Sequence, residues 1–100
     1  MKKWVLASLL SLFSVSAMAH TVSQAKHMRD NQDVTLTGKI VKYLGDENYL
    51  FKDHTGQIVI EVDDDDDERL RHYTGTVTLV GEIDRNDSRV KIDVDSVRKR

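Results

Sequence analysis

The hydrophobic and polar positions change their period once along the chain. In the stretch TVSQAKHMRD, Val22 and Ala25 recur at helical spacing, and Thr21 with Gln24 three residues later has the arrangement of a capping box. The pattern predicts a short helix that begins after Thr21 and ends near Asp30, where turn-forming residues gather. Beyond it, apolar and polar residues alternate, which is typical of half-buried strands.

Five segments follow the alternating pattern. In the last of them, Val90, Ile92 and Val94 alternate with charged residues over several positions. Gly38 and Gly81 take inward positions in their strands, as glycines do at sharp barrel bends. The predicted strands are 34–44, 49–53, 57–62, 76–84 and 89–97.

A polar connector separates the third strand from the fourth. Within it, Leu70 and Tyr73 lie three residues apart and predict one or two helical turns. The predicted fold class is therefore mainly β. The order of elements matches a five-stranded OB-fold Greek-key barrel, with a short N-terminal helix and a short helical connector between the third and fourth strands. A meander sandwich and an SH3-like barrel show similar alternation, but the helical connector favours the OB-fold.

The first 19 residues, MKKWVLASLLSLFSVSAMA, have the three parts of a secretory signal peptide. Two lysines precede an apolar run, and Ala17–Ala19 forms a small-x-small cleavage pattern. The apolar run is shorter than the roughly 20 residues that a transmembrane helix needs. We therefore expect a signal peptide over 1–19, a single OB-fold domain over 20–100, and no stable membrane insertion after cleavage.

Charge and composition argue against several classes of function. The full chain has 15 basic and 17 acidic side chains; removing the two signal-peptide lysines leaves 13 against 17, a net charge of −4. That balance argues against a nucleic-acid partner. There is no cysteine, hence no disulfide and no thiolate zinc site. No nucleophile elbow, zinc-protease motif or phosphate loop is present, so we expect no enzyme and no cofactor; a small hydrolase is the less favoured alternative.

Several motifs in order resemble one family. The segments VTLTGKIV, YLFKDHTGQIVIEVD, VTLVGEID and VKIDVDSV, spread over about 22–98, resemble the bacterial OB-fold (BOF) family of small exported proteins, the YgiW/YdeI-like group. The resemblance implies a periplasmic OB-fold that supports tolerance of oxidative, acid, metal or antimicrobial-peptide stress, and it implies no catalytic residues. The connector and the turn before the last strand lack the aromatic residues common in that family.

The expected ligand surface follows from the barrel. In OB-folds the second and third strands, together with the turns after the first and fourth strands, form the usual binding face. Its partner is expected to be a small ligand, an envelope glycan or a periplasmic protein. The candidate ligand-binding residues are Lys42, Tyr43, Tyr49, Lys52, Asp53, Asp84, Arg85 and Arg89.

The alternative function is metal binding or buffering in the periplasm. Cleavage would make His20 the new N-terminus, whose amine and imidazole suit copper. The acidic run Asp63–Asp67 lacks the glycine and the spacing of a calcium-binding EF-hand, and adjacent carboxylates repel one another. A solvated connector explains most of its composition. The candidate metal ligands under this alternative are His20, Asp63, Asp64 and Asp65.

Overall fold

The computed structural model describes residues 19–63, 66, 69–86 and 88–99. The predicted signal peptide therefore lies outside the described residues, apart from Ala19. Helix α2 spans Val22–Ala25, and the strands are β1 (Asp33–Gly45), β2 (Asn48–Asp53), β3 (Gly56–Val62), β4 (Thr76–Asn86) and β5 (Arg89–Lys99). No helix among the described residues is long and apolar enough to cross a membrane.

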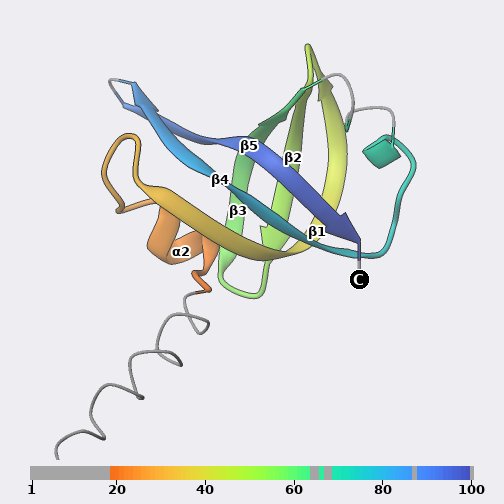
Figure 1. Cartoon of the computed structure of the whole chain (residues 1–100), viewed down its shortest axis with the longest axis horizontal. Coiled ribbons are helices and arrows are strands. Elements are labelled where there is room, and N and C mark those ends of the chain that lie inside the picture. The colour runs from red at the N-terminus through yellow and green to blue at the C-terminus, as the bar shows by residue number, and fades with distance from the viewer. Residues whose placement is uncertain (1–18, 64–65, 67–68, 87, 100) are drawn as a thin grey trace, which may run out of the picture.

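The strands close into one barrel in the order β1-β2-β3-β5-β4, with β4 pairing back to β1 (Figure 1). The β3–β5 pair is parallel and all other pairs are antiparallel. This topology, with a connector between β3 and β4, confirms the predicted OB-fold and removes the sandwich and SH3-like alternatives. The fifth strand runs to Lys99, beyond the predicted end at residue 97, because Arg98 and Lys99 pair with β4.

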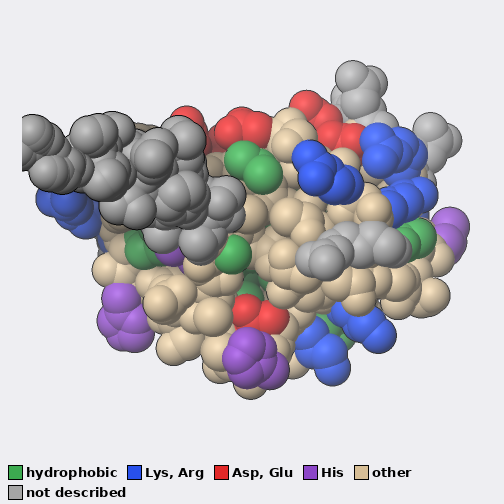
Figure 2. Space-filling model, turned by 60° about the horizontal axis from the view of Figure 1, so that its bottom comes forward, with side chains coloured by type: hydrophobic (Ala, Val, Ile, Leu, Met, Phe, Trp, Pro, Cys, Tyr) green, Lys and Arg blue, Asp and Glu red, His purple; other side chains and the backbone are tan. Residues whose placement is uncertain are grey.

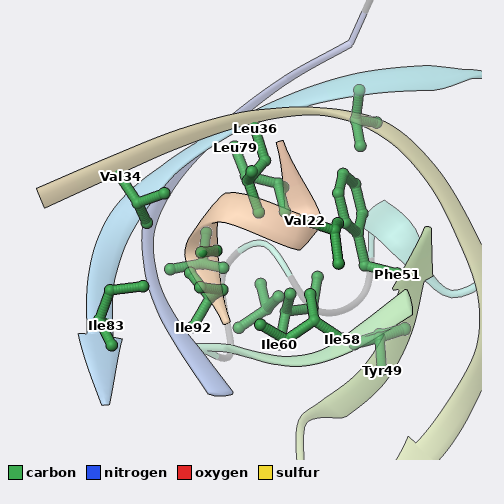
Figure 3. Packing of buried hydrophobic residues seen from close by; sticks show 14 of the residues in the cluster. Val22, Val34, Leu36, Tyr49, Phe51, Ile58, Ile60, Leu79, Ile83 and Ile92 are labelled. Atoms are coloured by element: carbon green, nitrogen blue, oxygen red, sulfur yellow. The ribbon is translucent and has the colours of Figure 1, made fainter. Parts of the chain in front are cut away.

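The alternating residues form the core. Inward positions of all five strands are buried, and α2 adds Val22 and Ala25 from one side (Figure 3). Leu70, from the connector, is also fully buried. Helical backbone at Asp66, Arg69 and Leu70 agrees with the predicted helical turn in the connector.

The helix α2 is shorter than the pattern predicts. The capping box forms, with the Thr21 hydroxyl accepting from the Gln24 amide and the Gln24 side chain accepting from the Thr21 amide. The helix nevertheless ends at Ala25, because the chain turns back toward β4 through Asn31, which has a positive φ of 68°. There Asn31 N donates to Ile83 O, and Ile83 N donates to Gln32 O. Pairing with the barrel therefore replaces further helical turns.

Candidate functional site

A groove lies between the two turns that project at the top of Figure 1, the β1–β2 turn and the β4–β5 turn. Its volume is about 400 Å³. Its floor includes Val59 of β3 and Lys91 of β5, which are cross-strand neighbours, and Asp84 of β4 stands opposite Lys91. The described lining residues are Leu44, Gly45, Asp46, Asn48, Val59, Asp84, Asn86, Arg89, Val90 and Lys91.

The β1–β2 turn shapes one wall of the groove. Gly45, Asp46 and Glu47 all have positive φ, at 97°, 51° and 68°. Positive φ at both central residues, Asp46 and Glu47, matches the twist of a two-residue hairpin, and Gly45 pairs with Asn48 across it. The Glu47 carbonyl accepts from the Val62 amide at 2.9 Å, which attaches the turn to the end of β3. The turn is thus fixed by backbone pairing on both sides.

Asn48 contributes an unusual polar atom to this wall. Its Nδ2 donates to the Asp46 carbonyl at 3.1 Å, which identifies the nitrogen of the amide. Its Oδ1 is buried and has no hydrogen-bond partner among the described residues. A buried acceptor left without a donor costs about 1–3 kcal/mol. Because this atom is closed off from solvent, it is a local cost of the chain around the β1–β2 turn.

An ion pair lies beside the groove floor. Lys91 Nζ contacts Glu61 Oε1 at 2.6 Å, with both side chains partly exposed. The hydrogen bond that Lys91 donates to the Glu61 carboxylate raises the pKa of Lys91, assisted by the negative charges of Glu61, Asp84 and Asp93. Lys91 therefore keeps its charge, and Glu61 neutralises much of it.

Carboxylates dominate the adjoining outer surface. Asp93 of β5 pairs with Glu61 of β3 on one side and with Glu82 of β4 on the other, so three acidic residues form one row across three strands. Partial burial raises the pKa of Asp93, and so do the negative charges of Glu61, Asp95 and Asp84. We call this row Glu61–Asp93–Glu82 the acidic row.

Of the eight predicted ligand-binding residues, two line the groove. Asp84 and Arg89 contribute to its β4 and β5 side. On the face seen in Figure 2, Asp and Glu side chains lie mainly along the upper edge with a further patch low in the middle, and Lys and Arg side chains lie mainly at the right. The structure thus brings part of the predicted surface together and disperses the rest.

The two tyrosines do not line the groove. Tyr49 is fully buried, which corrects its prediction as a ligand contact, because the alternation of β2 turns its ring into the core. Tyr43 is 39% exposed; its ring packs on Tyr49 with 5.0 Å between centroids, and the Arg71 guanidinium lies 4.4 Å from its centroid. Tyr43 therefore joins β1 to the connector through a cation–π contact.

Asp53 and Arg85 both make hydrogen bonds within the chain, and each lines a pocket other than the groove between the turns. The Asp53 carboxylate accepts from the amides of Val22 and Thr55 and from the Thr55 hydroxyl, at 2.9, 2.7 and 2.6 Å. Burial opposes a low pKa for Asp53, but these hydrogen bonds outweigh it and lower the pKa. Arg85 donates to the Lys26 and Met28 carbonyls and so fastens the chain after α2 to β4.

The two predicted lysines lie on the outer surface of the β1–β2 pair. Lys42 is exposed opposite Leu50, and Lys52 is exposed opposite Lys39. Lys52 lines a second, separate groove of about 400 Å³ together with Lys39 and His54. Neither Lys42 nor Lys52 reaches the groove between the turns.

Under the metal alternative, His20 lies against β1. Its backbone amide nitrogen donates to the Thr35 carbonyl at 2.8 Å, and its Nδ1 accepts from the Thr35 amide at 3.2 Å. In the described chain this nitrogen is a peptide amide joined to Ala19, so the copper site at a cleaved N-terminus stays a prediction. Within the described ranges, no group of three or more His, Asp or Glu residues is arranged to hold a metal ion. Asp63 is exposed, while Asp64 and Asp65 lie outside the described residues.

Eight of the ten described lining residues were not predicted from the sequence, among them the polar residues Asn48, Asp46 and Lys91. The stretch GDEN predicted a turn, and the alternation of 89–97 placed Lys91 outward, but neither signal shows that the turn and the strand face each other. That proximity depends on the parallel β3–β5 pair, which joins segments about 30 residues apart. The relevant signal in the sequence was a polar residue at the first position of a strand after a tight turn.

The fold and the groove define the protein class: a closed barrel of order β1-β2-β3-β5-β4, with a groove between the turns after β1 and β4, is an OB-fold protein. The chain belongs to the Bacterial OB fold (BOF) protein family, whose model matches residues 12–99. The predicted family resemblance is thereby confirmed.

Individual relatives agree with this assignment. Protein YgiW of Escherichia coli (strain K12) is 40% identical over 83 residues, which cover 79% of this chain and 62% of YgiW. The calcium-regulated OB-fold protein CarO of Pseudomonas aeruginosa is 38% identical over 78 residues, covering 77% and 67%. The solved structure of YgiW from E. coli matches with a TM-score of 0.72 at 38% identity, over 82% of this chain and 89% of that chain. The chain spans slightly less than two thirds of the full YgiW sequence.

Proposed function

We propose that the protein is a non-enzymatic, periplasmic binding protein that supports envelope stress tolerance by holding a small polar ligand in the groove between the β1–β2 and β4–β5 turns. The groove of about 400 Å³ between the two turns, lined by charged, amide and apolar side chains, is the observation that carries the binding role. The groove's mixture of carboxylates, cations and amides, with no aromatic ring among its described lining residues, suits a polar ligand better than a stacked nucleobase.

The proposed stress role rests on the family resemblance, and the proposed compartment rests on the N-terminal sequence pattern. The BOF resemblance implies tolerance of oxidative, acid, metal or antimicrobial-peptide stress, and the N-terminal pattern implies export. Cell fractionation followed by N-terminal sequencing tests this part. We expect a periplasmic protein that begins at His20; recovery of the uncleaved chain from the cytoplasm would contradict it.

Binding is tested by thermal unfolding of the exported protein with a ligand panel. A ligand that binds only the folded state raises the melting temperature by mass action. The panel contains peptidoglycan fragments, lipopolysaccharide pieces, polyamines and divalent ions. We expect at least one ligand class to raise the melting temperature in a saturable way, and less so in Asp84→Asn, which alters the groove without touching the core. If no small ligand of the panel changes the melting temperature, the groove proposal fails.

A second candidate function is cation buffering. The acidic run Asp63–Asp67 and the name of CarO as a calcium-regulated protein favour including calcium in the panel. Loose calcium association by a single acidic run gives dissociation constants of about 10⁻⁴ to 10⁻³ M at best. Calcium stabilisation that disappears when all five aspartates are replaced by asparagine would support this candidate. Stabilisation that persists in that variant would place the ion elsewhere.

A further inference from the structure

Two lysines face each other across neighbouring strands beside the second groove. Lys39 of β1 and Lys52 of β2 are directly paired, and both are exposed on the outer face of the barrel. Like charges directly opposite one another destabilise a sheet. Within the described part of the chain, neither ammonium group has a hydrogen bond or an ion pair. Departures from the local rules of folding are expected at functional positions, so this pair is a candidate binding element.

The lining of the second groove is rich in hydrogen-bond donors. Besides the two lysines and Asp53, its described lining residues are Thr37, Gly38, His54 and Thr76. The Thr37 and Thr78 hydroxyls lie 3.0 Å apart in one hydrogen bond, which uses only one of their two protons. The Asp53 carboxylate already accepts from the Val22 and Thr55 amides. Such a lining favours a ligand that offers acceptors.

The surroundings of the second groove leave its positive charge in place. The groove lies at the end of the barrel that carries the β2–β3 turn (Figure 1). Asp33, beside the acidic row, and Lys39 are at opposite ends of the β1 segment that pairs with β4. At the rise of an extended strand they are roughly 20 Å apart, and exposed charges at that distance are screened at a Debye length of about 8 Å. Arg98 adds a further cation, because it pairs with Thr78, which pairs with Thr37 of the lining.

The arrangement of the two ammonium groups favours one class of anion. Opposite residues of an antiparallel pair have Cβ atoms about 5 Å apart, so two flexible lysine side chains can reach the same anion. A phosphate group offers three acceptor oxygens and up to about two negative charges, and lysine binds it as a point charge. A carboxylate carries one charge and is matched better by the planar fork of an arginine. The groove therefore suits a phosphate better than a carboxylate.

We infer that the second groove binds a phosphate group, which Lys39 and Lys52 hold from two sides while the Thr76 hydroxyl and the His54 imidazole donate to its remaining oxygens. The groove volume of about 400 Å³ leaves room for a small group attached to the phosphate. Inorganic phosphate and the phosphate of a lipid headgroup both supply this chemistry. The site is separate from the groove between the turns, so the inference goes beyond the proposed function and does not rest on it.

The first experiment is an NMR titration of the exported protein with inorganic phosphate, with sodium acetate at equal ionic strength as the control. We expect phosphate to shift the amide signals of 37–39, 52–54 and 76 in a saturable way. Acetate is expected to shift them much less at the same concentration. Equal shifts from the two anions would show general screening of charge and overturn the inference. Phosphate shifts confined to 44–48 and 84–91 would also overturn it, since they would place the anion in the groove between the turns.

The source of the phosphate is tested with lipid vesicles. Sedimentation with phosphatidylglycerol vesicles is compared with sedimentation with phosphatidylcholine vesicles, whose headgroup has no net charge. Saturable shifts with inorganic phosphate identify a site for a free phosphate group. Binding to phosphatidylglycerol vesicles alone, lost when both lysines are replaced, identifies a site for a lipid headgroup. Absence of both responses would overturn the inference.

Variants make the assignment specific. Lys39→Gln and Lys52→Gln are each expected to weaken phosphate binding about three- to tenfold, and the double variant about tenfold or more. Lys42→Gln is the matched control, because it removes the same charge from an exposed position of β1 opposite Leu50 and outside the groove. It should change the dissociation constant less than about twofold. Unchanged affinity in the double variant, or an equal loss in Lys42→Gln, would overturn the inference.

Stability separates lost binding from lost folding. Because the like charges of Lys39 and Lys52 oppose each other, Lys39→Gln should raise the melting temperature in phosphate-free buffer by about 1–3 °C. A variant that melts no lower than the wild type and has lost phosphate binding supports the inference. If Lys39→Gln melts lower, Lys52→Gln carries the test in the same way. The two grooves are tested separately, so phosphate bound between the lysines neither supports nor removes the proposed function.

Discussion

Gly81 and Gly38 lie where neighbouring strands approach too closely for a side chain. A Cβ at Gly81 would collide with the Asp93 carbonyl, and one at Gly38 would collide with the Lys52 carbonyl and lie 2.9 Å from the Phe51 ring. These contacts involve backbone atoms of paired strands, which cannot move aside cheaply. The two glycines therefore allow the barrel to close, and the groove exists because it closes.

Gly81→Ala should lower the free energy of unfolding by about 1–3 kcal/mol, because the added methyl forces β4 and β5 apart. Gly56→Ala is the matched control: its Cβ would lie 3.6 Å from its nearest neighbours, an ordinary contact, so we expect a change within about 0.5 kcal/mol. Urea unfolding of the two variants and the wild type measures the change in the free energy of unfolding that each substitution causes. Equal destabilisation by the two substitutions would contradict the close-approach explanation.

Asp53 links α2 to the β2–β3 turn through hydrogen bonds to its charged form, which lower its pKa below the ordinary value of 3.8. A lowered folded-state pKa contributes stability above pH 3.8 that is lost as the pH falls through the folded value. Asp53→Asn should therefore be less stable than the wild type at pH 7, and the difference should shrink below pH 3.8. Chemical unfolding at a series of pH values measures this; a difference independent of pH would show that the charge of Asp53 is unimportant.

At the scale of elements, the acidic row shows like charges directly opposite one another on three adjacent strands. Such pairs destabilise a sheet by a few tenths of a kcal/mol each when exposed. The row persists in a folded barrel because the inward residues of the same strands, such as Ile60, Ile92 and Ile83, are fully or almost fully buried and supply the stabilisation. The negative surface beside the groove is thus compatible with the fold, though locally unfavourable.

Asp93→Asn should stabilise the protein at pH 7 by a few tenths of a kcal/mol, since it removes the central charge of the row. The pKa of Asp93 is raised, so its protonation supports the fold fully below pH 3.8, and that support is lost as the pH rises through the folded value. The advantage of the asparagine variant should therefore appear only as the pH rises above 3.8. Melting temperatures at low and neutral pH test this, with Asp33→Asn as the control. A variant less stable than wild type at pH 7 would contradict it.

The elements were largely predictable from periodicity, and the site was only partly so. The alternation of apolar and polar residues located the five strands and their core faces. Successive side chains of a strand point to opposite faces, so a strand buried on one face has an apolar residue at every second position. The length of α2 was overestimated, because the pairing of Asn31 and Gln32 with Ile83 is a tertiary contact. Tyr49 was predicted as a ligand contact, although its position in the alternating pattern of β2 indicates that its side chain points into the core. Asn48 escaped prediction, because an unsatisfied atom is visible only once its surroundings are folded.

At the scale of the whole molecule, the barrel separates structural from binding regions. Asp53 fastens α2 to the β2–β3 turn at one end of the barrel, whereas Arg85 fastens the segment after α2 to β4 close to the β4–β5 turn. The turns after β1 and β4 project at the other end and enclose the groove (Figure 1). This division agrees with the general behaviour of OB-folds, in which a rigid barrel positions variable loops for binding. A ligand is therefore expected to perturb the turns and leave α2 unchanged.

The most direct test of the central claim is chemical-shift mapping of the exported protein with the panel ligand that stabilises it most. The account predicts shifts concentrated at 44–48, 59–61 and 84–91, with little change at α2. Shifts concentrated instead around Lys39, Lys52 and His54 would place the ligand in the second groove and contradict the account.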